Sequence, residues 1–230
     1  MLRQILSGGD WYEIVAYLIS SFVVLFLVLP LHECAHGFVA YKLGDPTAKY
    51  QQRLTLNPLH HIDWVGAAAI LLVGFGWARP VPVNMRYFRR PKRDMALVAL
   101  AGPLSNLLAA LVSALICALM TFIGRRIVLS SVFAIQIYNL LIYLFLFLTQ
   151  INVSLAVFNL IPLPPLDGSR LLGAILPDRI YYRLMQYERY FSFLVLILCI
   201  SGSVGTAVGK VTGVLTNAIL RLAMLPFGLL

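Results

Sequence analysis

Five consecutive residues near the end of an apolar segment could do chemistry: His32, Glu33, Cys34, Ala35 and His36. Residues four apart lie on the same face of a helix, so both imidazoles can reach one metal ion. A glutamate beside the first histidine can take a proton from water held by that ion. The H-E-x-x-H pattern therefore indicates a zinc-dependent hydrolase, and it is usually found in soluble metalloproteases.

The surroundings of this motif are those of a membrane protein. The motif follows residues 14–31, which carry no charge, and a polar cluster beside such a segment is costly in lipid unless it has a function. Of the 230 residues, 60% are hydrophobic and 12% are charged, and the mean hydropathy is +0.87. A soluble domain carries about twice that charged share. We therefore predict an all-α polytopic membrane protein, a single domain over residues 1–230 with a catalytic core at about 11–176.

The net charge of +9 could indicate nucleic-acid binding, but the basic residues cluster between the apolar runs. In those places they orient helices and meet anionic headgroups, so we expect a lipid bilayer as partner and no nucleic acid. The three cysteines lie far apart within apolar runs, and no disulfide framework is expected. Cys34 is two residues from each motif histidine, about 200° around a helix, and points away from them.

Apolar runs separated by glycine, proline or arginine predict about five transmembrane helices. Their expected ranges are about 11–43, 95–123, 132–160, 190–201 and 205–225. Pro30 removes one backbone hydrogen bond and should kink the first helix just before the motif. The last helix carries Gly205, Gly209 and Gly213 at four-residue spacing, which lets another helix approach closely. That helix could be internal or belong to a second copy, so a homo-oligomer through these glycines stays open.

Residues 46–94, between the first two helices, are expected to be re-entrant or interfacial and β-hairpin-like. The apolar run 65–75 is about half the length that spans a bilayer. Pro80–Asn84 alternates like an edge strand, where proline is tolerated. Its two prolines share one edge, so Val81 and Val83 would keep their N–H groups on the other edge. We expect the segment Trp77–Phe88 to bind a substrate as an added strand.

Lysine and arginine are unevenly distributed between the expected helices. Nine lie between the first and second helices and four between the third and fourth, but only Arg125 and Arg126 lie between the second and third. The positive-inside rule places the richer segments in the cytoplasm. The motif ends the first helix and Asp167 follows the third, so both lie on that side. We expect a multi-pass protein of a prokaryotic cell membrane with its active site towards the cytoplasm.

The motif supplies two metal ligands, whereas a catalytic zinc ion usually has three and one position open to water. The candidates for the third are His60, His61, Asp63 and Asp167. Asp167 lies in a proline-rich break between apolar segments, and broken backbone at membrane depth is tolerated only where it lines a cavity. The same residues also fit a plain turn, so this reasoning leaves the third ligand open.

Four motifs, in this order, resemble those of the site-2 protease family of intramembrane zinc metalloproteases. They are H-E-C-A-H-G at 32–37, N-P-L-H-H-I-D at 57–63, G-P-L-S-N at 102–106 and F-N-L-I-P-L-P-P-L-D-G at 158–168. Together they cover about residues 30–170. H-E-x-x-H alone in an apolar chain is moderately specific, whereas its combination with the last two motifs is strongly specific.

The resemblance implies a metal site and a general base. His32, His36 and Asp167 match the ligands of one Zn²⁺ ion per chain. Glu33 matches the residue that takes a proton from water.

The resemblance also implies roles for three further polar residues. Asn159 matches a residue that helps to hold the oxyanion, and an asparagine amide is a suitable donor for that charge. Asn106 is a second candidate for this role, or it forms a hydrogen bond between helices. His61 matches the family's His-Ile-Asp and is interpreted as a pocket or substrate-binding residue.

The function that the resemblance implies is cleavage of transmembrane segments of other membrane proteins, in regulated intramembrane proteolysis. No PDZ domain lies between the first two helices and no CBS domain follows the last, as in the compact lineage of the family. The alternatives are a non-catalytic zinc-binding membrane protein and a metal transporter. A transporter should show related halves, and the chain shows no repeat. A metal scaffold would have no use for a base at Glu33.

Overall fold

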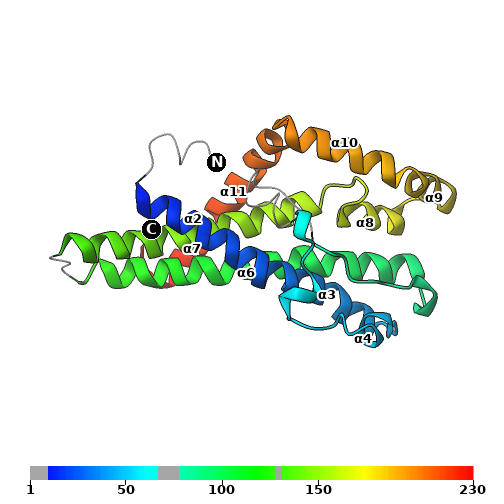
Figure 1. Ribbon diagram of the computed structural model, residues 1–230, viewed down its shortest axis with the longest axis horizontal. Helices are drawn as coiled ribbons and strands as arrows, with labels where there is room; N and C mark the ends of the chain where they lie inside the picture. Colours follow the sequence, from blue (N-terminus) through cyan, green and yellow to red (C-terminus); the bar gives the residue numbers. More distant parts are fainter. Residues whose placement is uncertain (1–9, 67–77, 128–130, 230) are drawn as a thin grey trace.

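The computed structural model describes residues 10–66, 78–127 and 131–229 (Figure 1). Two long helices, α6 (Pro91–Gly124) and α7 (Val132–Asn159), lie side by side and form the framework of the bundle. The helix α2 (Trp11–Val23) packs on α7, and α3 (Leu29–Lys42) packs on α6. The helix α11 (Ser203–Met224) packs on both long helices.

Within the described ranges, four helical stretches are long and apolar enough to cross a membrane, judged by length and composition. They are Trp11–Lys42, Pro91–Gly124, Val132–Asn159 and Val208–Phe227. The prediction of an all-α polytopic membrane protein is confirmed. The expected span at about 190–201 corresponds to α10 (Glu188–Ile200), which has 13 residues. A helix of that length rises about 20 Å, short of the roughly 30 Å hydrocarbon core, so α10 does not cross by itself.

The first span contains an irregular turn just before the H-E-x-x-H motif. A π-helical turn, η1 (Val24–Val28), joins α2 to α3. Pro30 is the second residue of α3 and cannot donate to the carbonyl of Phe26, which explains why the regular ladder is broken here. Val24 and Val28 pack against Leu148 of α7, so one face of the irregular turn is buried in the bundle, while Phe26 and Leu27 stay exposed.

The prediction of an edge strand at Pro80–Asn84 is wrong. In the described part of the chain, the pairing in this region is one isolated antiparallel bridge between Ile62 and Ala78. The N–H groups of Val81 and Asn84 are bound by side-chain carboxylates and not by a neighbouring strand, which is why no ladder forms. Most of the apolar run 65–75 lies outside the described residues.

Short helical pieces connect the long helices. They are α4 (Thr47–Tyr50), η2 (Pro58–His60), η3 (Met85–Tyr87) and, after α11, η4 (Leu225–Phe227). A buried apolar cluster of Ala40, Phe88, Met95 and Val98 holds the end of α3 against the start of α6.

The chain leaving α7 turns back towards α3. Residues 160–166 are irregular because prolines cannot donate to a helical ladder, and α8 (Asp167–Ile175) then packs on α6. Next come α9 (Asp178–Gln186) and α10, at the outer edge of the molecule in Figure 1. Lys92 of α6 pairs with Asp178 and donates to the carbonyl of Leu176 at 2.9 Å. The helices α3, α6 and α8 therefore frame one region.

Candidate metal centre and active site

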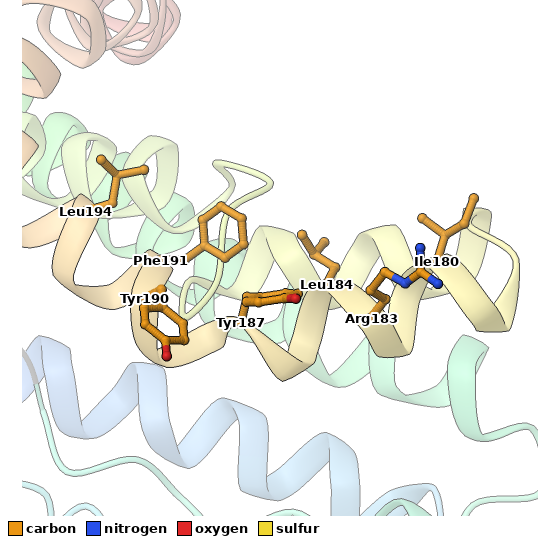
Figure 2. Close-up of a pocket in the computed structure, with 7 residues that line it drawn as sticks. All are labelled: Ile180, Arg183, Leu184, Tyr187, Tyr190, Phe191 and Leu194. Carbon is orange, nitrogen blue, oxygen red and sulfur yellow. The ribbon is translucent and has the colours of Figure 1, made fainter.

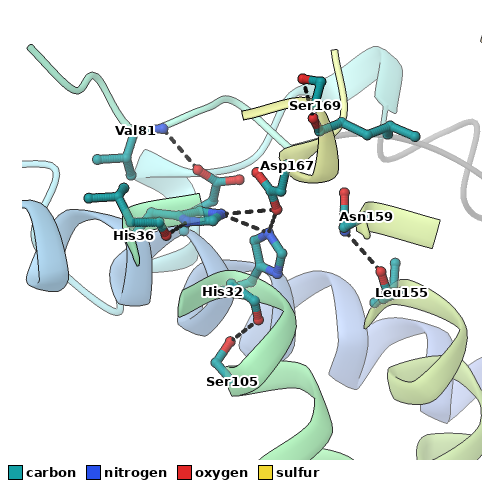
Figure 3. A network of polar contacts seen from close by, with 12 residues as sticks. His32, His36, Val81, Ser105, Leu155, Asn159, Asp167 and Ser169 are labelled. Atoms are coloured by element: carbon teal, nitrogen blue, oxygen red, sulfur yellow. Dashed lines mark hydrogen bonds and ion pairs between the residues drawn. The ribbon is translucent and has the colours of Figure 1, made fainter. Parts of the chain in front are cut away.

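The two motif histidines lie one turn apart on α3 (Figure 3). His32 and His36 are only 5% and 9% exposed. Their Nε2 atoms lie 3.0 Å apart. The spacing of four residues places both imidazoles on one face, as helix geometry requires, so a single ion could contact both.

The helix α6 orients the imidazole of His36. Its Nδ1 lies 2.7 Å from the carbonyl oxygen of Val98, and this contact assigns the proton to Nδ1. Nε2 of His36 then presents a lone pair towards His32. An outer hydrogen bond of this kind is the usual support for a metal-binding histidine. Nδ1 of His32 is buried and has no hydrogen-bond partner within the described residues.

Gly102 allows α6 to approach the two imidazoles closely. A Cβ atom at this position would lie 2.5 Å from Cε1 and Nε2 of His32 and closer still to Nε2 of His36. Any side chain here would therefore collide with the histidines. The glycine of the G-P-L-S-N motif is explained by this contact.

The helix α8 brings a carboxylate to the same place. Oδ2 of Asp167 lies 3.3 Å from Nε2 of each histidine. A Cβ at Gly168 would collide with the carbonyls of Leu160 and Ile161, so the Asp-Gly pair lets the start of α8 pack on the chain that leaves α7. Burial disfavours ionisation of Asp167, but the neighbouring imidazoles outweigh it and hold its pKa well below the usual range.

The three donor atoms fit a tetrahedral zinc site. Zinc binds imidazole nitrogen and carboxylate oxygen at about 2.0–2.1 Å, which separates the donors by roughly 3.3–3.4 Å at tetrahedral angles. The separations here are 3.0, 3.3 and 3.3 Å. His60, His61 and Asp63 do not belong to this cluster. The carboxylate of Asp63 instead accepts the N–H groups of Val65 and Gly66.

Glu33 lies beside the cluster on the same helix and is partly exposed. Its Oε2 accepts the backbone N–H of Val81 at 2.8 Å, a contact drawn in Figure 3. The side chain of Val81 is buried against the same helix, 3.2 Å from where a Cβ on Gly37 would lie. The segment that contains Val81 is therefore held directly on the motif helix.

The two asparagines differ in how far they can be reached. Asn159 ends α7 and is half-buried, and its Nδ2 donates to the carbonyl of Leu155 at 3.0 Å. An amide nitrogen carries two hydrogens, so one remains as a donor. Asn106 lies one turn beyond Gly102 and is 1% exposed, and neither of its amide atoms has a hydrogen-bond partner within the described part. Asn159 is the better placed of the two to meet a substrate.

The other predicted substrate residues lie deeper than expected. Val83 packs against the apolar cluster that joins α3 to α6. His61 is 1% exposed, and its Nε2 lies 2.7 Å from the carbonyl of Thr55. Its own carbonyl accepts the N–H of Arg79 at 2.8 Å. His61 therefore supports the start of the segment 79–84 through this backbone hydrogen bond.

Sequence reasoning missed two buried charged residues next to this segment. Nη2 of Arg53 donates to the carbonyls of Arg79 and Pro80, and Asp45 is fully buried and accepts the N–H of Asn84. Asp45 stands between glycine and proline, which indicates only the end of a helix. Arg53 contributes only to the count of positive charge. No spacing in the sequence connects either residue to the segment 79–84.

An apolar hollow lies along α9 and α10 (Figure 2), and none of its lining residues belongs to the candidate site. It is lined by Tyr187, Tyr190, Phe191, Leu194 and other side chains. Apart from Arg183, these side chains carry no charge and no metal-binding group. The hollow therefore contributes nothing to the candidate site.

Comparison with known families decides what kind of protein carries this geometry. A match to Peptidase family M50 covers residues 20–201. The chain belongs to this family. The predicted membership of the site-2 protease family is thereby confirmed. The protein is a zinc metalloendopeptidase and a multi-pass membrane protein.

Two relatives show how far the similarity to other M50 members extends. The protein named "Putative zinc metalloprotease YwhC" from Bacillus subtilis is 41% identical over 190 residues, which are 82% of this chain and 82% of that protein. Zinc metalloprotease MJ0392 of Methanocaldococcus jannaschii is 29% identical over 163 residues, which are 70% of this chain but 35% of that protein. No solved structure matches the chain significantly.

Proposed function

We propose that this metalloendopeptidase cuts transmembrane segments of other membrane proteins, as in regulated intramembrane proteolysis. The supporting observation is that α3 is the last part of one candidate membrane span, Trp11–Lys42. Its histidines face α6, which is a second candidate span. This arrangement supports a metal centre between membrane-spanning helices, within reach of a substrate that enters through the membrane.

In this proposal, His32, His36 and Asp167 hold one zinc ion per chain. When bound, zinc polarises the scissile carbonyl and lowers the pKa of water towards neutrality. Glu33 takes the proton from the attacking water and passes it to the leaving amine. The free N–H of the Asn159 amide donates to the oxyanion that forms on the substrate.

The segment 79–84 is proposed to receive the substrate. A helix hides its carbonyls in hydrogen bonds, so a transmembrane substrate must unwind locally and find new partners in an apolar setting. The N–H of Val81 already donates to Glu33, so the N–H of Val83 is the donor that is proposed to meet the substrate on the edge beside Glu33. An unwound chain added along this edge lies beside the proposed base. His61 supports the start of the segment through its hydrogen bond to Arg79.

The location and assembly of the protein follow as further proposals. We place the site towards the cytoplasm of a prokaryotic cell, which lets water reach it, and keep residues 1–230 as one domain with its catalytic core at about 11–176.

A Cβ on Gly205, Gly209 or Gly213 would meet nothing within 4 Å, so no described part of the chain packs on this stripe. A second copy would cover it, and cross-linking of cysteines placed along α11 tests that pairing.

The decisive experiment compares the wild-type protein with Glu33→Gln on a transmembrane reporter, together with metal analysis. The amide keeps the shape of the side chain but cannot take a proton, while the three proposed ligands stay in place. We expect unchanged zinc and no cleavage. Cleavage at near wild-type rate by Glu33→Gln would end this mechanism.

A further inference from the structure

The segment 79–84 is fixed at both ends by buried charges. At its start, Nη2 of Arg53 donates to the carbonyl of Arg79 at 2.7 Å and to that of Pro80 at 3.2 Å. At its end, Oδ2 of Asp45 accepts the N–H of Asn84 at 2.6 Å. A buried charge is costly without compensating partners. Within the described residues Arg53 has these carbonyls but forms no salt bridge.

One peptide group connects Arg53 to the proposed general base. The carbonyl of Pro80 and the N–H of Val81 belong to the same planar, trans peptide unit, so they point in opposite directions. The oxygen accepts from Arg53 at 3.2 Å, and the N–H donates to Oε2 of Glu33 at 2.8 Å. The guanidinium and the carboxylate therefore face each other across this peptide. Hydrogen bonds in such a chain polarise and strengthen one another.

The side chain of Glu33 depends on this contact for its orientation. Glutamate has three rotatable side-chain bonds, and Glu33 is partly exposed. The bond from Val81 is its hydrogen bond in the described structure. It occupies Oε2, and Oε1 has no hydrogen bond within the described residues. Catalytic groups must be held to within about half an ångström to act efficiently.

We propose that Arg53 is a positioning residue for the general base, acting through the peptide group between Pro80 and Val81. This inference rests on the proposed role of Glu33. Arg53 does not contact the reacting atoms. It sets the plane of the peptide, and the peptide holds the carboxylate. Its effect should therefore appear mainly in kcat, with zinc content unchanged and only a smaller effect on KM through the substrate-receiving segment.

The first test compares Arg53→Gln and Arg53→Lys with Arg86→Gln, which removes an exposed arginine from the same connection. Losing a charge-assisted hydrogen bond in a chain of this kind should lower kcat roughly tenfold to a hundredfold in Arg53→Gln. Lysine keeps the charge and should restore part of the rate, and Arg86→Gln should behave like wild type. An unchanged kcat in Arg53→Gln, or a loss confined to KM, overturns the proposal.

A second test alters the peptide group between Pro80 and Val81, which removes the N–H and weakens the Pro80 carbonyl as an acceptor, and it leaves the side chain of Arg53 in place. Val81 is replaced by its α-hydroxy analogue, which turns the amide into an ester, and the same replacement at Val83 serves as the control. The ester at 81 should lower kcat as Arg53→Gln does, and the two changes together should cost no more than either alone. Additive losses overturn the proposal. A rise in KM for the ester at 83 reports on strand addition and leaves the role of Arg53 standing.

A third measurement needs no proteolysis, so it separates failure of this inference from failure of the proposed function. Selective ¹⁵N-valine labelling observes the Val81 amide in the zinc-loaded protein in micelles. Its proton should resonate downfield and move upfield in both Glu33→Ala and Arg53→Gln. If the chemical shift of the Val81 amide proton does not change in Arg53→Gln, the positioning role is overturned, even if the wild-type protein cleaves its reporter.

Discussion

Replacing Gly102 by alanine tests the geometry of the metal centre most directly. The added methyl group would lie 2.5 Å from Cε1 and Nε2 of His32 and closer still to Nε2 of His36. Ordinary contact needs 3.4–4 Å, so the imidazoles or α6 must move by about 1 Å. Metal–ligand distances tolerate only about 0.2 Å, so a shift of that size separates the proposed ligands.

The expected size of the effect follows from overpacking. Forcing a methyl group into a filled site costs about 1–3 kcal/mol, which corresponds to roughly a fivefold to 150-fold weaker affinity for zinc. Alanine also favours a helix over glycine by up to about 1 kcal/mol. Folding should therefore suffer less than metal binding. The variant should be helical and membrane-inserted but poor in zinc.

The assay measures zinc per chain after equilibration with a competing chelator, with circular dichroism as a check of folding. The matched control is Gly209→Ala on α11, where a Cβ meets nothing within 4 Å and zinc should stay at the wild-type level. If Gly102→Ala retains zinc as firmly as the wild-type protein, the closeness of α6 to the histidines does not govern the site.

Three further predictions follow from the arrangement of the site. Asp167→Ala should lose zinc, whereas Asp63→Ala should keep it because the carboxylate of Asp63 binds backbone N–H groups away from the cluster; metal analysis that gives the reverse would reassign the third ligand. Asn159→Ala should keep zinc and lower kcat by roughly 10²–10³-fold, as loss of one oxyanion donor does, and a full rate would remove Asn159 from the mechanism. Cysteines placed at Arg90 and Arg125 should be labelled by an impermeant reagent from the cytoplasmic and the outer side, respectively; labelling of both from one side would contradict the topology.

The long helices could be predicted because lipid leaves the backbone few alternatives. A spanning segment must satisfy its own hydrogen bonds, so apolar length and the glycines and prolines that end it determine its range. The second and third helices begin and end within a few residues of their expected ranges. The fourth expected span was misjudged because its apolar composition was given weight over its length, and the expected range of about 190–201 is itself too short to cross.

The candidate site could likewise be predicted only in part from the sequence. His32 and His36 could be placed on one face from local spacing, and Asp167 could be placed at the same depth from the charge distribution. The contact of Val98 with His36 and the hold of Arg53 on the segment 79–84 could not be foreseen. They join residues 62 and 26 or more positions apart, and they arise from packing that leaves no periodic signal.

The π-helical turn η1 (Val24–Val28) lets the two halves of the first span face different helices. Such a turn inserts one residue into an α-helix, which rotates everything beyond it by roughly 100°. Before the turn, Ala16 and Tyr17 are aimed at α7; after it, the histidines are aimed at α6. The first half of the span can therefore pack on α7 while the second half presents the histidines to α6, and neither orientation constrains the other. Deleting one residue from η1 would restore a regular α-helix. Either Ala16 and Tyr17 would then lose their contact with α7, or the histidines would lose theirs with α6.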